Sequence, residues 1–339
     1  MSKALTAREL AKLAGVSVAT VSRVSRGIGQ VSPETRKRVL AAIEAHGYRP
    51  SHLGRALAER RHGSLGLVFP GLSGPYYAEL IQGFESEAVK ARASVHILCT
   101  HLRDDSDEQV LEMAYRADGI AVLGGTVSDA TLEQLREMAP VVLLAADPAP
   151  GVHTVTVDNA AAMEALTAHL LDTHRARTFA FVGDPTGSPD VTGRWTGFRR
   201  ALESAGLTPP RTPVKVALQQ HDGVVAADRL LARAALPDAI VCANDELALG
   251  VLIRLLSRGV DVPGDVAVTG FDDAPMAELV RPTLTTVRQP VRELAATTAR
   301  TLLDLVDREG GDQAASTTVL STEVVVRRSC GCRPRKREA

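Results

Sequence analysis

The side chains that could do chemistry in this chain form no catalytic pattern. The nine histidines lack the spacing of metal ligands, and the four cysteines (Cys99, Cys242, Cys330, Cys332) are scattered. Asp272 and Asp273 are adjacent carboxylates, but neighbouring side chains usually point apart. The chain has no P-loop, nucleophile elbow or HExxH zinc motif. We therefore expect a binding protein rather than an enzyme, with no cofactor and no metal site.

One short segment does carry a binding chemistry. Residues 17–24, SVATVSRV, alternate small and hydroxyl side chains with valines. In a helix Val21 and Val24 face inward. A helix that enters the DNA major groove needs short side chains near the base edges, hydroxyls for phosphates and an arginine for guanine or phosphate. The predicted DNA contacts are Ser17, Val18, Ala19, Thr20, Ser22, Arg23 and Arg26.

Residues 1–48 contain the elements that would position this segment. Thr6 and Glu9 have capping-box spacing, Ser17 and Ser32 are N-cap residues, and Gly15 and Gly47 end helices. The pattern is a helix-turn-helix. Its predicted core is Leu10, Leu13, Val16, Val21, Val24, Val39 and Ile43.

The charge of the 339-residue chain is unevenly distributed. Residues 1–63 hold twelve Lys and Arg against four Asp and Glu, a formal charge of +8, whereas the remainder carries −9. A basic head suggests a polyanionic partner. No apolar run approaches the ~18 residues of a membrane span. With no secretory signal and few cysteines, we expect a cytoplasmic protein.

Residues 49–63, RPSHLGRALAERRHG, form a basic joint with helical spacing at Leu53, Ala56 and Leu57. Gly54 weakens a helix by roughly 1 kcal/mol relative to alanine. The joint is therefore either a plain linker or a hinge that folds only on DNA. In the second case a leucine could wedge into the minor groove.

Residues 64–329 predict a two-lobed α/β body, and residues 330–339 a basic tail. Nine β-like runs alternate with helical stretches such as 76–92, 160–173 and 192–205, which favours doubly wound parallel sheets. The runs are LGLVF, SVHILC, GIAVLG, VVLLAA, TVTV, TFAFVG, VKVAL, AIVCA and VAVTG. Nine strands are too many for one such sheet, so we expect two lobes.

Aromatic residues mark a candidate binding cleft. Phe69, Tyr76, Tyr77 and Phe271 lie at or just after strand ends. Ligands in such sheets bind beyond the carboxyl ends of the strands. Aromatic faces stack on sugars or bases, but each ring could equally belong to the core.

The chain resembles the lac-repressor (LacI/GalR) family of bacterial transcription regulators. The resemblance lies in TARELAKLAGVSVATVSRV, VSPETRKRVLAAIEAHGYRP, GFRRAL, CANDELALG, VAVTGFDD and LTTVRQP. It implies two lobes joined by three crossings, near 158–159, 289–290 and 320–322. It also implies an effector cleft between the lobes, a minor-groove leucine at Leu57, and dimers on partly palindromic operators.

The same resemblance suggests effector contacts. Arg194, Asp272 and Asn244 match ligand-binding positions of the family, and Tyr76 and Tyr77 match a pair that lines the pocket in some members. The remaining candidates are Asp147 and Asp190. A carboxylate and a guanidinium suit vicinal hydroxyls. The alternative is that Arg194 and Asp272 form a structural ion pair that contacts no effector.

We therefore predict a homodimeric DNA-binding regulator, a repressor controlled by a sugar-like effector. One alternative is a corepressor-dependent regulator with a purine-like ligand. Another is a sugar-binding protein without a DNA function, which the basic head disfavours. Effector and operator are not identified by the sequence.

Overall fold

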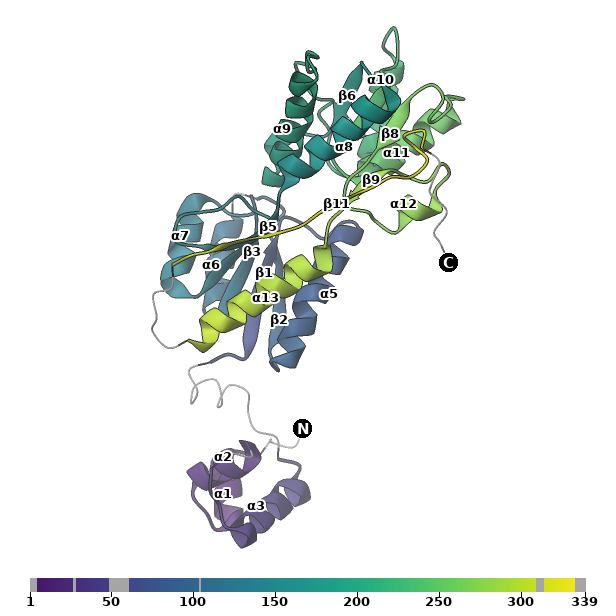
Figure 1. The fold of residues 1–339 in the computed structure, drawn as a ribbon. Helices are drawn as coiled ribbons and strands as arrows, with labels where there is room; N and C mark the ends of the chain where they lie inside the picture. Colours follow the sequence, from purple (N-terminus) through teal and green to yellow (C-terminus); the bar gives the residue numbers. More distant parts are fainter. Residues whose placement is uncertain (1–4, 27–28, 49–60, 104, 309–313, 333–339) are drawn as a thin grey trace. The chain divides into compact units, whose positions relative to one another are not determined.

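The computed structural model describes residues 5–26, 29–48, 61–103, 105–308 and 314–332. It divides into two compact units, a head of residues 1–63 and a body of residues 64–339 (Figure 1). Leu57 and most of the predicted hinge, residues 49–60, lie outside the described residues.

The head is built of three helices, α1 (Ala7–Ala14), α2 (Val18–Arg26) and α3 (Pro33–His46). Thr6 and Glu9 form the predicted capping box, and both Gly15 and Gly47 end helices in the left-handed conformation. The backbone N–H of Thr20 donates to Ser17 Oγ at 3.1 Å, and Ser32 caps α3. These local signals confirm the predicted helix-turn-helix pattern.

The head core contains six of the seven predicted residues and adds Ala11, Ala14 and Tyr48. Leu10, Val21, Val24 and Val39 are buried, and Val16 and Ile43 pack against them. The prediction for Leu13 was wrong, because its side chain is 56% exposed. Successive helix positions are about 100° apart. In the short helix α1 the buried stripe runs through Leu10, Ala11 and Ala14, and Leu13 falls beside it.

The N-terminal lobe of the body is a six-stranded parallel sheet in the order β10-β5-β4-β3-β1-β2. Helices α5 and α13 cover one face, and α6 and α7 cover the other. The elements are β1 (Ser64–Phe69), α5 (Pro75–Lys90), β2 (Ser94–Cys99), α6 (Ser106–Ala114), β3 (Gly119–Leu123), α7 (Asp129–Met138), β4 (Val141–Leu144), β5 (His153–Val157), α13 (Val291–Asp307) and β10 (Thr317–Leu320).

The C-terminal lobe has a three-stranded parallel sheet, β6-β7-β8, and an antiparallel pair, β9 and β11. One continuous core joins the sheet to its helices. The elements are α8 (Asn159–His174), β6 (Phe179–Val182), η1 (Pro185–Gly187), α9 (Pro189–Ser204), α10 (Gln220–Leu231), β7 (Ala239–Cys242), α11 (Asp245–Ser257), β8 (Ala267–Thr269), α12 (Met276–Leu279), β9 (Thr286–Arg288) and β11 (Glu323–Val325).

The chain crosses between the lobes at the three predicted places. It passes from β5 to α8 at 158–159, from β9 to α13 at 289–290, and from β10 to β11 at 321–322. Figure 1 shows the yellow third crossing running from the six-stranded sheet to the other lobe. The prediction of a two-lobed α/β body is therefore confirmed.

Two predictions about the body were wrong. VKVAL (214–218) is not a strand, since only Val214 forms a bridge, to Val182. The basic tail does not start at 330, because Cys330 is 2% exposed and belongs to the core of the C-terminal lobe. In the described part of the chain, no helix is both long and apolar enough to span a bilayer.

Candidate functional site

A cavity of about 440 Å³ lies between the two lobes of the body. Its lining comes mainly from the loops that follow β1, β3, β6, β7 and β8 and from the N-terminal turns of α5, α9 and α11. Ligands of parallel α/β sheets bind at such carboxyl ends. The volume lies in the range of small-molecule sites.

Arg194 is the buried cation of this cavity. It projects from α9 and is 4% exposed. Its Nε donates to Asn159 Oδ1 at 2.9 Å, its Nη1 donates to the Ala243 carbonyl at 2.8 Å, and its Cζ lies 3.9 Å from the Phe271 ring centroid. Helix α9 can hold this position because Gly197, which has no side chain, packs against the backbone of Ala160 in α8.

Two carboxylates face the remaining nitrogen of this guanidinium. Arg194 Nη2 lies 3.6 Å from Asp272 Oδ1 and 4.0 Å from Asp190 Oδ2, beyond normal hydrogen-bond distance. Other residues hold the carboxylates in place: Gln289 Nε2 donates to Asp272 Oδ1 at 2.6 Å, and Asn159 Nδ2 donates to Asp190 Oδ1 at 2.8 Å. The Nη2 group is thus directed at the site but left to donate to a ligand.

Burial dominates the electrostatics of this trio. It raises the pKa of Asp272 to about 6, although Arg194 acts in the opposite direction. Burial likewise raises the pKa of Asp190. One guanidinium therefore does not compensate two buried carboxylates, and the site favours a ligand that brings hydrogen-bond donors.

Tyr76 and Tyr77 form an aromatic wall from the first turn of α5. Their rings meet edge to face with centroids 5.6 Å apart, and Tyr77 meets Phe69 in the same way at 5.5 Å. The Tyr76 hydroxyl is buried and has no hydrogen-bond partner among the described residues. Burial raises the pKa of Tyr76 well above its usual value and that of Tyr77 to about 12. Both phenols are therefore neutral near pH 7, and each can donate.

The other candidates differ in their placement. Asn244 lines the cavity, but its Oδ1 caps α11 and its Nδ2 donates to the Leu218 carbonyl. Asp147 is exposed and is not among the lining residues. Phe69 and Phe271 are fully buried, so both belong to the core, and the Phe271 ring also supports Arg194.

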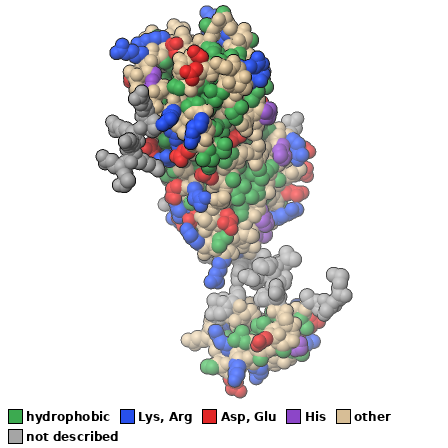
Figure 2. All heavy atoms as spheres, turned by 90° about the vertical axis from the view of Figure 1, so that its right-hand side faces the viewer, with side chains coloured by type: hydrophobic (Ala, Val, Ile, Leu, Met, Phe, Trp, Pro, Cys, Tyr) green, Lys and Arg blue, Asp and Glu red, His purple; other side chains and the backbone are tan. Residues whose placement is uncertain are grey.

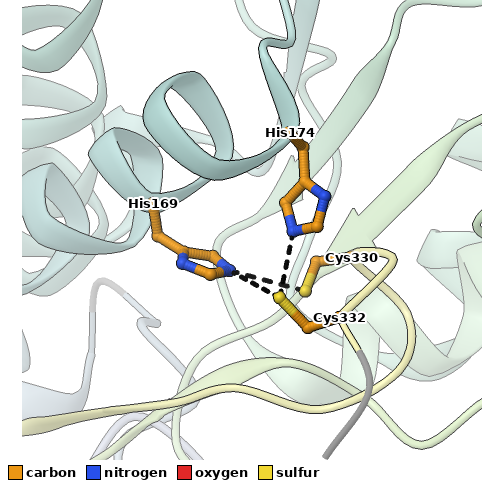
Figure 3. Close-up of side chains that lie close together, drawn as sticks. All are labelled: His169, His174, Cys330 and Cys332. Atoms are coloured by element: carbon orange, nitrogen blue, oxygen red, sulfur yellow. Dashed lines mark hydrogen bonds between the residues drawn. The ribbon is translucent and has the colours of Figure 1, made fainter.

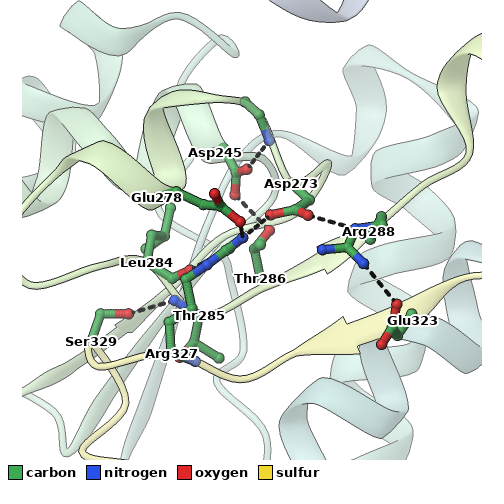
Figure 4. A network of polar contacts seen from close by, with 11 residues as sticks. Asp245, Asp273, Glu278, Leu284, Thr285, Thr286, Arg288, Glu323, Arg327 and Ser329 are labelled. Carbon is green, nitrogen blue, oxygen red and sulfur yellow. Dashed lines mark hydrogen bonds and ion pairs between the residues drawn. The ribbon is translucent and has the colours of Figure 1, made fainter. Parts of the chain in front are cut away.

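Asp272 and Asp273 do point apart. Both residues line the cavity, but Asp272 lies near Arg194, whereas Asp273 Oδ2 accepts from Arg288 Nε at 2.7 Å and its Oδ1 lies 2.6 Å from Arg327 Nη2. Figure 4 shows this polar network joining the loop after β8 to β9 and the C-terminal segment. Asp273 therefore anchors the loop that presents Asp272.

Two family models match this chain. One, described as bacterial regulatory proteins of the lacI family, covers residues 6–51, and one described as a periplasmic binding protein-like domain covers residues 167–330. Catabolite control protein A of Priestia megaterium is 33% identical over 317 residues, which make up 91% of this chain and 95% of that protein. The chain belongs to the lacI family of bacterial regulatory proteins. This lacI-family chain is a DNA-binding transcriptional regulator, as the resemblance implied.

Solved structures agree with this assignment. A complex named transcriptional regulator CelR-cellobiose is 30% identical, with a TM-score of 0.72 over 96% of this chain and 99% of that one. The lac repressor dimer bound to operator and the anti-inducer ONPF has a TM-score of 0.85 over 97% of this chain and 99% of that one. At 23% identity the second likeness supports the fold alone.

The head of the lacI-family chain presents its predicted DNA surface on α2. Ser17, Val18, Ala19 and Arg23 are exposed, Thr20 and Ser22 are half-buried, and Val21 and Val24 face the core. The buried side of α2 and its solvent-facing side are therefore the ones predicted from the sequence. Arg26 is the last residue of α2.

The sequence prediction missed two kinds of residue in this lacI-family chain. Asn159 and Gln289, which hold Arg194 and Asp272, lie at two of the lobe crossings, a position that could have indicated them. Cys330 and Cys332 lie beside His169 and His174, a grouping that the sequence analysis, which described the cysteines as scattered and expected no metal site, did not predict.

Proposed function

We propose that this lacI-family regulator is a repressor whose operator binding is controlled by a small, sugar-like effector in the inter-lobe cavity. The observation that carries the proposal is the Arg194 guanidinium, whose Nη2 lies 3.6 Å and 4.0 Å from two largely buried carboxylates without a hydrogen bond to either. An ordinary structural ion pair would close this distance.

A polyhydroxylated ligand fits the chemistry of the cavity. Its hydroxyls would donate to Asp190 and Asp272 and accept from Arg194 and from the unpartnered Tyr76 hydroxyl. The tyrosine rings offer apolar faces for a sugar ring. The solved CelR-cellobiose complex, 30% identical to this chain, supports the same ligand class.

The head would read DNA through α2. The exposed Val18 and Ala19 would approach thymine methyls, and the hydroxyls of Ser17, Thr20 and Ser22 would contact phosphates or bases. Arg23 and Arg26 would reach guanine or phosphate. Leu57 would enter the minor groove once the hinge folds on DNA.

The body would pair with a second copy of the chain. Figure 2 shows hydrophobic side chains gathered on the side where α5, α11 and α12 lie. Exposed apolar residues of α11 and α12 include Ile253, Leu256, Met276 and Leu279, with exposed fractions of 39–66%. An exposed apolar patch of this kind marks an interaction site. A dimer formed there would carry two heads, as a partly palindromic operator requires.

The effector would act by changing the lobe arrangement. A ligand bridging Arg194 and Asp272 to Tyr76 would join walls that belong to different lobes. One direct bond already crosses the cavity, from Ser73 Oγ to Gln219 Oε1 at 2.6 Å. The effector shifts DNA affinity only by its differential affinity for the two arrangements.

We place this regulator, without catalytic activity, in the cytoplasm.

Two experiments with the full chain test the proposal. Selection from random duplexes should enrich a partly palindromic site, and a pool with no enriched sequence would contradict the DNA function. Calorimetric titration with mono- and disaccharides, cellobiose included, should reveal saturable binding. If purines bind and no sugar does, the corepressor alternative is correct and the effector class proposed here is wrong.

A further inference from the structure

Four side chains that take no part in the proposed effector site converge in the C-terminal lobe. His169 and His174 project from the last turns of α8, and Cys330 and Cys332 flank the turn that follows β11. Their four donor atoms all lie within 4.8 Å of one another (Figure 3). None of the four residues lines the inter-lobe cavity.

Three of the donor–donor distances are close to those around a tetrahedral ion. Zinc bonds of about 2.3 Å to sulfur and about 2.0 Å to nitrogen give donor–donor edges of roughly 3.3–3.8 Å in a tetrahedron. Cys332 Sγ lies 3.2 Å from His174 Nε2 and 3.7 Å from His169 Nε2, and Cys330 Sγ lies 3.5 Å from His169 Nε2. We propose that His169, His174, Cys330 and Cys332 bind Zn²⁺ as a closed structural site.

The backbone between the cysteines is shaped for this grouping. Gly331 has φ +103°, which other residues rarely adopt, and a Cβ there would lie 3.2 Å from Cε1 and Nδ1 of His174. A glycine thus lets the turn carry both cysteines up to the histidine ring. The two imidazoles meet edge to face, with centroids 5.3 Å apart.

Outer contacts orient the donors. The Thr285 hydroxyl donates to Cys330 Sγ at 3.1 Å, which favours the thiolate form. Thr173 Oγ1 lies 3.3 Å from His169 Nδ1, so the other ring nitrogen, Nε2, is the one presented to the cysteines. Metal-binding histidines usually have such a second partner.

The chemistry and charge of the four donors also suit Zn²⁺. Two cysteines and two histidines are one of the usual donor sets of structural zinc sites. When Zn²⁺ binds, each thiol loses its proton to solvent and forms a Zn–S bond. Two thiolates balance the dication, so that the site is neutral overall and suits a partly buried position.

The site would join two distant parts of the chain. Helix α8 follows the first lobe crossing, and the cysteine turn follows the third, so that the donors are separated by about 160 positions. Closing a long loop strongly restricts the unfolded chain. A closed four-ligand set leaves no position for substrate, so the role is structural.

The test uses the full, untagged chain, reduced and freed of metal. The parent should take up one Zn²⁺ per chain by elemental analysis, and Co²⁺ should give the visible bands of a tetrahedral site with thiolate charge-transfer absorption. Thermal unfolding should move to higher temperature with Zn²⁺. Cys332→Ser and His174→Gln should each weaken metal binding by ~100-fold or more, as losses of direct ligands.

The matched control is Cys99→Ser, which removes a cysteine of the other lobe and should leave Zn²⁺ uptake unchanged. The proposal is overturned if the reduced parent binds no Zn²⁺ and gives no tetrahedral Co²⁺ spectrum, or if Cys332→Ser binds like the parent. A Cys330–Cys332 disulfide that re-forms under reducing conditions would also overturn it. Because the parent spectrum alone decides the first outcome, a variant that fails to fold does not affect the test.

Discussion

Replacing Asp272 with asparagine separates an effector site from a structural ion pair. The substitution keeps the shape of the side chain and lets Oδ1 accept from Gln289, and asparagine tolerates the positive φ of 113° at this position. If the Asp272 carboxylate serves to bind a ligand, then, in the absence of ligand, Asp272→Asn should be more stable than the parent. If the carboxylate serves instead to pair with Arg194, then Asp272→Asn should be less stable than the parent.

The sign and size follow from the pKa of Asp272. Burial raises this pKa to about 6 in the folded protein, from 3.8. The folded state therefore holds more protons between these values, and its stability falls as the pH rises through this window. At about 1.36 kcal/mol per pKa unit, the charge costs about 3 kcal/mol above pH 7. Asp272→Asn should gain up to this amount at pH 7.5 and almost nothing below pH 4.

Asp273→Asn is the matched control, since it makes the same chemical change one residue away. Asp273 is bound by Arg288 at 2.7 Å and by Arg327 at 2.6 Å, and its side chain is 8% exposed. Removing one partner of a buried ion pair costs about 3–5 kcal/mol. This variant should therefore lose stability where Asp272→Asn gains it.

The assay is denaturant unfolding from pH 4 to pH 8, followed by fluorescence of Trp195, the single tryptophan. Its ring packs on Phe198 and Phe181 in the C-terminal lobe, so it reports the unfolding of that lobe. A loss of stability in Asp272→Asn comparable to that in Asp273→Asn would refute the reasoning and make Arg194–Asp272 a structural pair.

Three further predictions concern the head, the helix pair and the effector. Operator affinity should fall ~10³-fold or more between about 50 and 200 mM salt, and an affinity that does not change with salt would contradict phosphate-driven docking. Variants of Val18 and Ala19 should change the preferred DNA sequence. Gly197→Ala should lower the free energy of unfolding, measured in urea, by about 3 kcal/mol. Alanine normally favours helices. Here, however, its Cβ would lie 2.0 Å from the Ala160 carbonyl oxygen. Gly187→Ala, with open space around it, is the control and should be near neutral. Sugar affinity measured by calorimetry should fall by up to about tenfold per pH unit below about 6, because protonated Asp272 no longer accepts from a hydroxyl; pH-independent affinity would exclude this contact.

Local signals made the head predictable. Its caps and left-handed glycines depend on residues a few positions apart, and Thr6, Ser32 and Gly47 act as their types require. Leu13 was misplaced because eight residues of helix define the buried stripe only loosely. The three lobe crossings came from the family resemblance, and periodicity alone could not have located them.

Long-range relationships were the part that the sequence could not supply. VKVAL is apolar because Val216 and Leu218 line the cavity, a reason that an alternating pattern does not distinguish from a strand. Asn159 and Gln289 carry no motif and act only through the side chains that they hold. The His–Cys cluster joins positions about 160 residues apart, so no spacing rule could have revealed it.

The most direct test of effector control is the operator affinity of Arg194→Ala with and without sugar. Titrations of a selected duplex by fluorescence anisotropy should show that a sugar bound by the parent changes its operator affinity by about 5–150-fold, the usual range of allosteric coupling. Arg194→Ala should bind the same duplex as tightly as the sugar-free parent and show no response to the sugar. If Arg194→Ala responds as the parent does, or if no bound sugar alters the parent's operator affinity, then the cavity does not control DNA binding.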